Sequence, residues 1–124
     1  MATLLSALGA AASGMDAQAM RLRHLSENIA NADTPGYQRK ISTFRVDEGG
    51  VALGPVRLDD RAAARIHDPG HPLADSSGHY DGSNVDLVLE LADAREAQRS
   101  YEANLRIFDQ ARQMSQSLFD LIRR

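Results

Sequence analysis

The feature that most constrains this chain is a heptad-like spacing of apolar residues at each of its two ends. Near the N-terminus, alternate steps of three and four residues reach an apolar side chain at nine of ten positions. These positions are Met1, Leu4, Leu8, Ala11, Met15, Gln18, Leu22, Leu25, Ile29 and Ala32. An average step of 3.5 residues is typical of a coiled-coil seam. We therefore predict a helix over residues 4–32, with Thr3 as its N-cap and residues 33–36 as its end.

The C-terminal part repeats this pattern, with seven apolar residues at nine positions. These positions are Ala94, Ala97, Tyr101, Asn104, Phe108, Ala111, Ser115, Leu118 and Ile122. The predicted helix covers residues 85–124, with Ser83 or Asn84 as its N-cap. A helix of about 38 residues within this stretch would be near 57 Å long, whereas a compact chain of this size is only about 35 Å across. Such a helix cannot bury its apolar face within its own monomer.

The residues between the two helices have a different character. Residues 37–46 are rich in β-formers, and three short strands are predicted at 51–53, 56–58 and 62–66. Residues 68–84 are predicted to be a polar loop. The fold class is mainly α, with two long terminal amphipathic helices that pair as a coiled coil around a small β-rich insert. The corresponding division of the chain is 1–33, 34–84 and 85–124.

Composition and charge narrow the possible functions. The chain has three Phe, three Tyr and no Trp, so a lone monomer buries little large apolar surface and is marginally stable. A net charge of −3 gives no electrostatic reason to expect nucleic acid or an anionic membrane as a partner. No cysteine is present, which excludes disulfides and thiolate chemistry. We expect neither a Sec-type signal peptide nor a membrane span.

Apolar residues also lie off the main seams. They are Leu5, Leu105, Ile107, Phe119 and Leu121. This second face predicts that each helix contacts more than one neighbour, and head-to-tail contacts of that kind build helical tubes. Gln18 and Asn104 are polar residues within the seams. They either fix the register of the helices or lie exposed at a helix flank.

Two sequence motifs resemble those of flagellar rod and hook proteins. Residues 26–40 read SENIANADTPGYQRK and are similar to the N-terminal motif of that family. The matching positions are Asn28, Ala30, Asn31, Thr34, Pro35, Gly36 and Tyr37. Residues 99–104 (RSYEAN) together with Met114 resemble the C-terminal motif. Residues 68–72 (DPGHP) and 84–86 (NVD) favour one of the two small proximal rod subunits over the other.

The resemblance implies a structural subunit of the proximal rod that has no enzymatic activity and no cofactor. Its implied partners are other rod subunits, further copies of itself, and the flagellar type III apparatus, which would export it unfolded to the periplasmic rod. A cytoplasmic coiled-coil adaptor or chaperone is the alternative from another class. The residues expected to serve assembly are Leu8, Met15, Leu22, Leu25, Asn28, Ile29, Ala30, Asn31, Thr34, Pro35, Gly36, Tyr37, Tyr101, Ala103, Asn104, Phe108, Leu118 and Ile122.

The chemistry of the turn agrees with this motif. Gly36 is predicted to supply a positive φ. Asn28 and Asn31 are predicted to bond free backbone groups at the end of the helix, and Tyr37 to anchor the returning chain. A well-made helix stop explains the same residues, and the two interpretations are compatible.

Other polar clusters have simpler interpretations. The histidines and aspartates of residues 67–81 follow no common zinc spacing, so a solvated loop is expected in place of a metal site. Asp86, Glu90 and Asp93 are interpreted as a solvated face near a helix start, with no cleft for acid–base catalysis. His24 is expected to face solvent. A salt-bridged helix surface is expected from the alternation of Arg95, Arg99, Arg106 and Arg112 with Glu96, Glu102 and Asp109.

Overall fold

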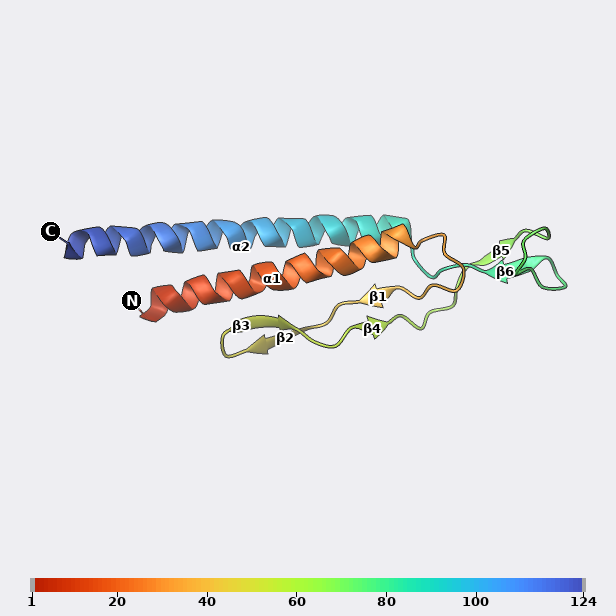
Figure 1. Cartoon of the computed structure of the whole chain (residues 1–124), viewed down its shortest axis with the longest axis horizontal. Helices are drawn as coiled ribbons and strands as arrows, with labels where there is room; N and C mark the ends of the chain where they lie inside the picture. The colour runs from red at the N-terminus through yellow and green to blue at the C-terminus, as the bar shows by residue number, and fades with distance from the viewer. Residues whose placement is uncertain (1, 124) are drawn as a thin grey trace.

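Two long antiparallel helices form the body of the molecule in a computed structural model that describes residues 2–123 (Figure 1). Helix α1 spans Ala2–Ala30 and helix α2 spans Leu87–Ile122. The C-terminal end of α2 extends past the start of α1. The predicted fold class is thereby confirmed, and neither helix among the described residues is long and apolar enough to cross a membrane.

The ends of the helices differ from the predicted caps. Helix α1 already includes Ala2, so Thr3 lies inside its first turn and is not the N-cap. The N-cap of α2 is Asp86, whose carboxylate accepts a hydrogen bond from the backbone N–H of Val88 at 3.1 Å. The prediction of Ser83 or Asn84 was wrong because both side chains bond to other segments of the chain.

The predicted seams are the sheltered faces of the two helices. Every seam residue described from Leu4 to Ile29 and from Ala94 to Ser115 is buried or half-buried. Leu118 and Ile122, in the last turns of α2, are exposed instead. The apolar pattern of α2 is therefore longer than the partner surface that one monomer provides.

The helices approach closely where Gly14 faces Asn104. A Cβ atom at Gly14 would lie 2.8 Å from the Asn104 side chain, so a larger residue there would require the Asn104 amide to move. The Asn104 amide donates to Ser100 of its own helix at 3.0 Å, and Gln18 accepts from Arg21 at 3.4 Å. Both polar seam residues are half-buried, and each of these hydrogen bonds stays within one helix, so neither bond fixes the register across the seam.

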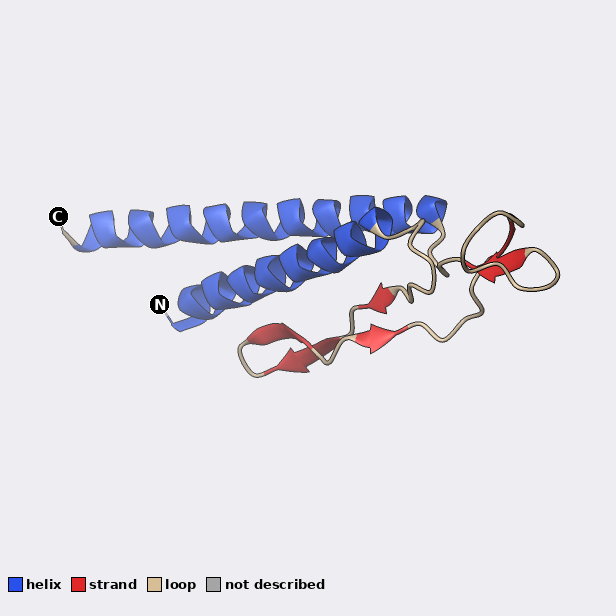
Figure 2. Cartoon of the chain, turned by 45° about the vertical axis from the view of Figure 1, so that its right-hand side comes forward, coloured by secondary structure: helices blue, strands red, loops and turns tan. Residues whose placement is uncertain are grey.

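The insert consists of three antiparallel strand pairs (Figure 2). The pairs are β1 (Lys40–Ile41) with β4 (Arg57–Leu58), β2 (Phe44–Asp47) with β3 (Gly50–Leu53), and β5 (Arg65–His67) with β6 (His79–Asp81). The β2–β3 hairpin packs on α1, where Ser13 Oγ accepts from the backbone N–H of Val51 at 3.1 Å. The β5–β6 hairpin projects beyond the helices (Figure 1).

Strand β6 lies in the segment predicted to be a loop. Its residues are polar, and what makes them a strand is pairing with β5, including Ile66 opposite Tyr80. The turn between the two strands is ordered by Asp75, whose carboxylate bonds Ser77 and His79 and forms an ion pair with Arg65 at 2.6 Å. The segment is thus part of an ordered β-hairpin and not a solvated loop.

Candidate functional site

The helices and the insert meet at a junction that is held together by buried polar side chains. Asn28 on α1 and Glu90 on α2 are completely buried, and Asp59, next to β4, is 6% exposed. Buried polar groups are costly unless they are hydrogen-bonded, and no buried side-chain nitrogen or oxygen among the described residues lacks a partner. Loss of any one of these side chains would therefore leave another buried polar group without its hydrogen-bond partner.

Asn28 is the centre of this junction. Its Oδ1 accepts from the backbone N–H of Lys40 and from the hydroxyl of Tyr37, both at 2.8 Å. Its Nδ2 donates to the carbonyl of Lys40 at 3.0 Å and to Glu90 Oε2 at 3.1 Å. An asparagine amide has two donors and one acceptor oxygen, so its capacity is fully used. Asn28 was predicted to bond free backbone groups at the end of the helix, and the backbone groups that it bonds are those of Lys40 in the returning chain.

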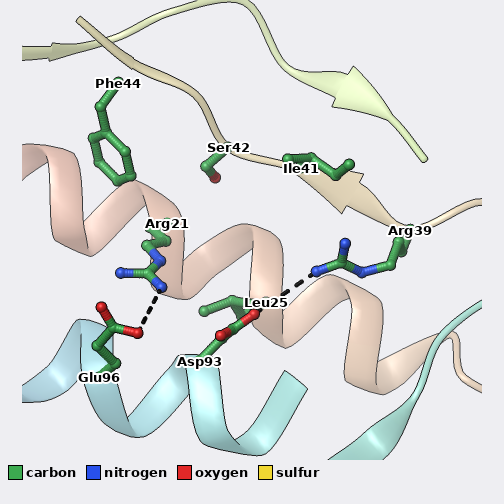
Figure 3. A pocket seen from close by; sticks show the side chains of 8 residues that line it. All are labelled: Arg21, Leu25, Arg39, Ile41, Ser42, Phe44, Asp93 and Glu96. Atoms are coloured by element: carbon green, nitrogen blue, oxygen red, sulfur yellow. Dashed lines mark ion pairs between the residues drawn. The ribbon is translucent and has the colours of Figure 1, made fainter. Parts of the chain in front are cut away.

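Arg39 connects the insert to the second helix. Its Nε donates to Glu90 Oε1, and its terminal nitrogens lie 3.2 Å from Asp59 and 3.8 Å from Asp93. Its backbone N–H donates to Asn84 Oδ1 at 2.7 Å. The Arg39 guanidinium thus contacts carboxylates of α2, among them Asp93 (Figure 3), and of the segment after β4. A guanidinium is suited to this role because its N–H donors point in several directions within one plane.

The turn after α1 is tied to the segment before α2. Gly36 has φ +75°, as predicted, and its N–H donates to the carbonyl of Gly82 at 3.1 Å. Ser83 Oγ donates to the carbonyl of Ala32. Asn31 bonds the carbonyl of Glu27 at 2.8 Å, which confirms its predicted role at the helix end. The turn is both a helix stop and a contact surface for the rest of the junction.

The residues predicted for assembly fall into three groups. Asn28, Asn31, Gly36 and Tyr37 come together at the junction, and Thr34 bonds Asn31 at 3.1 Å. Seven others lie on the sheltered helix faces: Leu8, Met15, Leu22, Leu25, Ile29, Tyr101 and Phe108. Asn104 faces Gly14, whereas Ala30, Pro35, Ala103, Leu118 and Ile122 are exposed.

Sequence reasoning missed the charged half of the junction. Glu90 was expected on a solvated face but is fully buried, because it meets Arg39 and Asn28. One signal was present, since Glu90 is the single charge within the run LVLEL at residues 87–91. His24 was expected to face solvent but is 8% exposed, and its Nδ1 lies 2.7 Å from Ser42 Oγ.

The expected salt-bridged surface of α2 is largely absent from residues 2–123. Of the seven charged residues, Arg112 pairs with Asp109 at 3.9 Å and Glu96 pairs with Arg21 of α1 at 3.6 Å. Arg95, Arg99 and Arg106 form no ion pair with any described residue. Glu102, which lies on the same face of α2, also has no ion-pair partner among residues 2–123.

Large apolar side chains are exposed along both helices. The five apolar residues predicted off the main seams are between 41% and 64% exposed: Leu5, Leu105, Ile107, Phe119 and Leu121. They do not form a single face, because Leu105 and Ile107 lie about 160° apart around α2. On the first turns of α2, Leu87, Val88, Leu89 and Leu91 are exposed as well. Extended apolar patches of this kind mark surfaces that bind other proteins.

The β5–β6 hairpin holds histidines that were weighed as metal ligands. His71 stacks on Tyr80 with ring centroids 3.9 Å apart, and the rings of His67 and His79 are 4.6 Å apart. Across residues 2–123, no three side chains of His, Asp or Glu are grouped as metal ligands would be.

Comparison with known proteins places both ends of the chain in one family. Residues 4–38 match the model of the flagella basal body rod protein, and residues 76–121 match that of the flagellar basal body rod FlgEFG protein C-terminal region. A relative from Agrobacterium fabrum, named flagellar basal-body rod protein FlgC, is 43% identical, with 91% of each chain covered. A protein of the same name from Salmonella typhimurium is 33% identical, and the match covers 90% of this chain and 92% of the relative. Another from Aquifex aeolicus is 30% identical, and the match covers 97% of this chain and 98% of the relative.

Proposed function

The chain belongs to the flagellar basal body rod protein family, and from that premise we propose that it is a structural subunit of the proximal rod. In this role it packs with other rod subunits and with copies of itself, and it transmits torque through those contacts. The observation that carries the proposal is the exposed apolar surface of α2, which one monomer does not cover. The relatives, which are named as rod proteins, do not favour the cytoplasmic adaptor.

The junction gives this subunit a defined shape. Because Asn28, Arg39 and Glu90 tie the insert to both helices, the insert is fixed relative to the helix pair at this end. A fixed attachment suits a part that transmits force, since it prevents the insert from moving freely on the helices. The predicted assembly residues serve two roles in this proposal: those at the junction shape it, and those on the sheltered helix faces pack α1 and α2 against each other.

The route to the rod is the second part of the proposal. The resemblance to rod and hook proteins implies export through the flagellar type III apparatus, without a cleaved signal peptide, to the periplasmic part of the basal body. No catalytic role is proposed, because the charged side chains of the junction are used in holding the fold together.

The test is a gene deletion combined with fractionation of basal bodies. A strain without this chain should fail to swim, and the reintroduced chain should restore swimming and copurify with isolated basal bodies. N-terminal sequencing of the copurified chain should return the encoded N-terminus. A swimming deletion strain, or a chain that stays in the cytoplasm of a swimming strain, would contradict the proposal.

The purified protein provides a second test. Circular dichroism combined with light scattering should show a monomer with less helix than the 29 and 36 residues of α1 and α2, because the helix surfaces await neighbours. A discrete, fully helical dimer or tetramer would favour the adaptor instead.

A further inference from the structure

The β5–β6 hairpin (Figure 2) ends in the single Asp-Gly pair of the sequence, Asp81 and Gly82. The side chain of Asp81 is 64% exposed, whereas Gly82 is buried. In an Asp-Gly pair the backbone nitrogen of the glycine can attack the aspartate side chain with little hindrance, because glycine has no Cβ atom. The chain therefore contains a site at which its own backbone can rearrange.

The rearrangement passes through a succinimide ring. The nitrogen of Gly82 bonds to Cγ of Asp81, and one carboxyl oxygen leaves as water with the amide proton and a proton from solvent. Water then opens the ring at one of its two carbonyl carbons. Opening at Cγ restores aspartate, whereas opening at the backbone carbonyl gives isoaspartate, in which the main chain continues through the former side chain. The sequence of steps consumes only water and protons and returns both.

The folded hairpin holds the attacking nitrogen. The N–H of Gly82 donates to the carbonyl of Ala64 at 2.8 Å, and the N–H of Ala64 donates to the carbonyl of Ser83 at 3.1 Å. The amide proton of Gly82 must leave before the ring can close, but it is hydrogen-bonded and lies in a buried residue. An amide of this kind reacts only when the segment around it opens.

The carboxylate of Asp81 is held as well. Its Oδ1 lies 2.9 Å from a terminal nitrogen of Arg65, the residue directly opposite on β5. Arg65 is fixed in turn by Asp75 at 2.6 Å. These ion pairs direct the carboxylate across the strand pair, whereas the nitrogen of Gly82 follows along β6. Ring closure also requires rotation about the Cα–C bond of Asp81, which the pairing of the two strands prevents.

Gly82 also connects the hairpin to the turn after α1. Its carbonyl accepts from the N–H of Gly36 at 3.1 Å, and a Cβ atom at Gly82 would lie 2.7 Å from Cδ1 of Ile66. Isoaspartate adds one carbon to the main chain immediately before Gly82. This extra carbon shifts Gly82 relative to Ala64 and Gly36, so the rearranged chain loses the contact between the turn and the segment before α2.

We propose that Asp81–Gly82 is a site of isoaspartate formation that reacts in the unfolded chain and is blocked when β5 pairs with β6. Folding thus protects the connection between the hairpin and the turn at Gly36. A chain that rearranges before it folds does not regain this connection. The inference goes beyond the rod function and does not depend on it, because it concerns the chemistry of a single chain.

The first test compares the folded and the unfolded full-length chain. The purified protein is kept at neutral pH in buffer and in guanidinium chloride, and isoaspartate at Asp81 is measured by peptide mapping and by methyl transfer from an isoaspartate methyltransferase. Isoaspartate should form at least about tenfold faster in guanidinium chloride, because the folded protein reacts only when the hairpin opens. Equal rates, or no isoaspartate at Asp81 in the denaturant, would overturn the inference.

Variants separate the reactive pair from the contacts that block it. Gly82→Ala should form little isoaspartate in guanidinium chloride, because its methyl group hinders the attack. Arg65→Gln removes the ion pairs of the hairpin and should react about two- to fivefold faster than wild type in buffer, with an unchanged rate in the denaturant. Arg57→Gln, at an exposed position of β4, is the matched control and should change neither rate. An unchanged rate of Arg65→Gln in buffer contradicts the blocking role of the strand pair.

Hydrogen exchange tests the effect on the turn. After incubation in guanidinium chloride and return to buffer, the rearranged chain should exchange the backbone N–H groups of Gly36 and Gly82 faster than a freshly unfolded and refolded sample. Gly82→Ala, incubated in the same way, should show no such change at Gly36. Equal exchange in the rearranged and fresh wild-type samples would show that the rearrangement leaves the connection intact and would contradict the inference.

Discussion

The side-chain amide of Asn28 lies 3.1 Å from the carboxylate of Glu90, although the two residues are 62 positions apart in the chain. Both side chains are completely buried. The contact joins the last turns of α1 to the first turns of α2, and it also includes the backbone of Lys40. A buried polar contact of this kind is specific, because an imperfect partner leaves a donor or acceptor unsatisfied.

The first prediction concerns Asn28→Asp, which keeps the shape of the side chain. The new carboxylate would face the carboxylate of Glu90 and lose the donor to the Lys40 carbonyl, so we expect a loss of about 2 kcal/mol or more in the free energy of unfolding. Urea unfolding followed by circular dichroism measures it. Adding Glu90→Gln should recover part of the loss, since the glutamine amide can donate to the new carboxylate. An unchanged stability in Asn28→Asp would contradict the assigned hydrogen bonds.

The second prediction concerns the charge of Glu90. Glu90→Gln in the wild-type background leaves the guanidinium of Arg39 without its closest carboxylate, and loss of one member of a buried pair costs about 3 kcal/mol. Hydrogen exchange at the backbone N–H of Arg39 and Lys40 should accelerate. Glu102→Gln, at an exposed position of the same helix, is the matched control and should leave exchange unchanged.

The third prediction separates backbone strain from packing at Gly36. No atom would lie within 4 Å of a Cβ there, but φ is +75°, so a side chain is disfavoured by the backbone alone. Gly36→Ala should reduce the free energy of unfolding by about 1–2 kcal/mol, and Gly36→Asn by less, because asparagine tolerates this conformation better. Equal stability of the glycine and alanine proteins would show that the turn relaxes to another conformation.

The fourth prediction is an acid sensitivity of the junction. A hydrogen bond from the backbone N–H of Arg61 lowers the pKa of the Asp59 carboxyl, and the guanidiniums of Arg61 and Arg39 lower it further. In the unfolded chain the pKa of this carboxyl is about 3.9. Because its pKa is lower in the folded protein, the ionised carboxylate stabilises the fold at any pH above about 3.9. This stabilisation is lost as the pH falls from there through the lower pKa of the folded state.

Thermal unfolding between pH 7 and pH 3 measures this sensitivity. The wild-type protein should lose stability at the acid end of the range. Asp59→Asn should be less stable than wild type at pH 7, and the difference should narrow towards pH 3. A difference that stays constant with pH would exclude Asp59 as a source of the acid sensitivity.

The fifth prediction concerns the sheltered helix faces. Leu22→Asp and Phe108→Asp each place a charge at a half-buried seam position, and a buried charge without a partner is strongly unfavourable. Both variants should be exported but absent from basal bodies, and the cells should not swim. Val46→Asp is the control, because Val46 is 90% exposed. Normal swimming in either seam variant would contradict the helix packing.

The apolar spacing was sufficient to predict both helices, because a 3.5-residue repeat is a local property that every turn of the helix repeats. The strands were predicted less completely. Strand β3 could be found from its own β-formers, whereas β6 depends on its partner β5. The helix caps were predicted incorrectly, since Ser83 and Asn84 are suitable N-caps in isolation but bond Ala32 and Asp59 in the fold.

The sequence by itself determined the two helices, the turn at Gly36 and, through its motifs, the family. Each of these depends on residues that are close together in the chain. Only the tertiary structure decided that Glu90 and His24 are buried, and that Asn28 bonds the returning chain. The physical reason is that a charged side chain has no preferred environment of its own: whether it faces solvent or a buried partner depends on which distant segments the fold brings beside it.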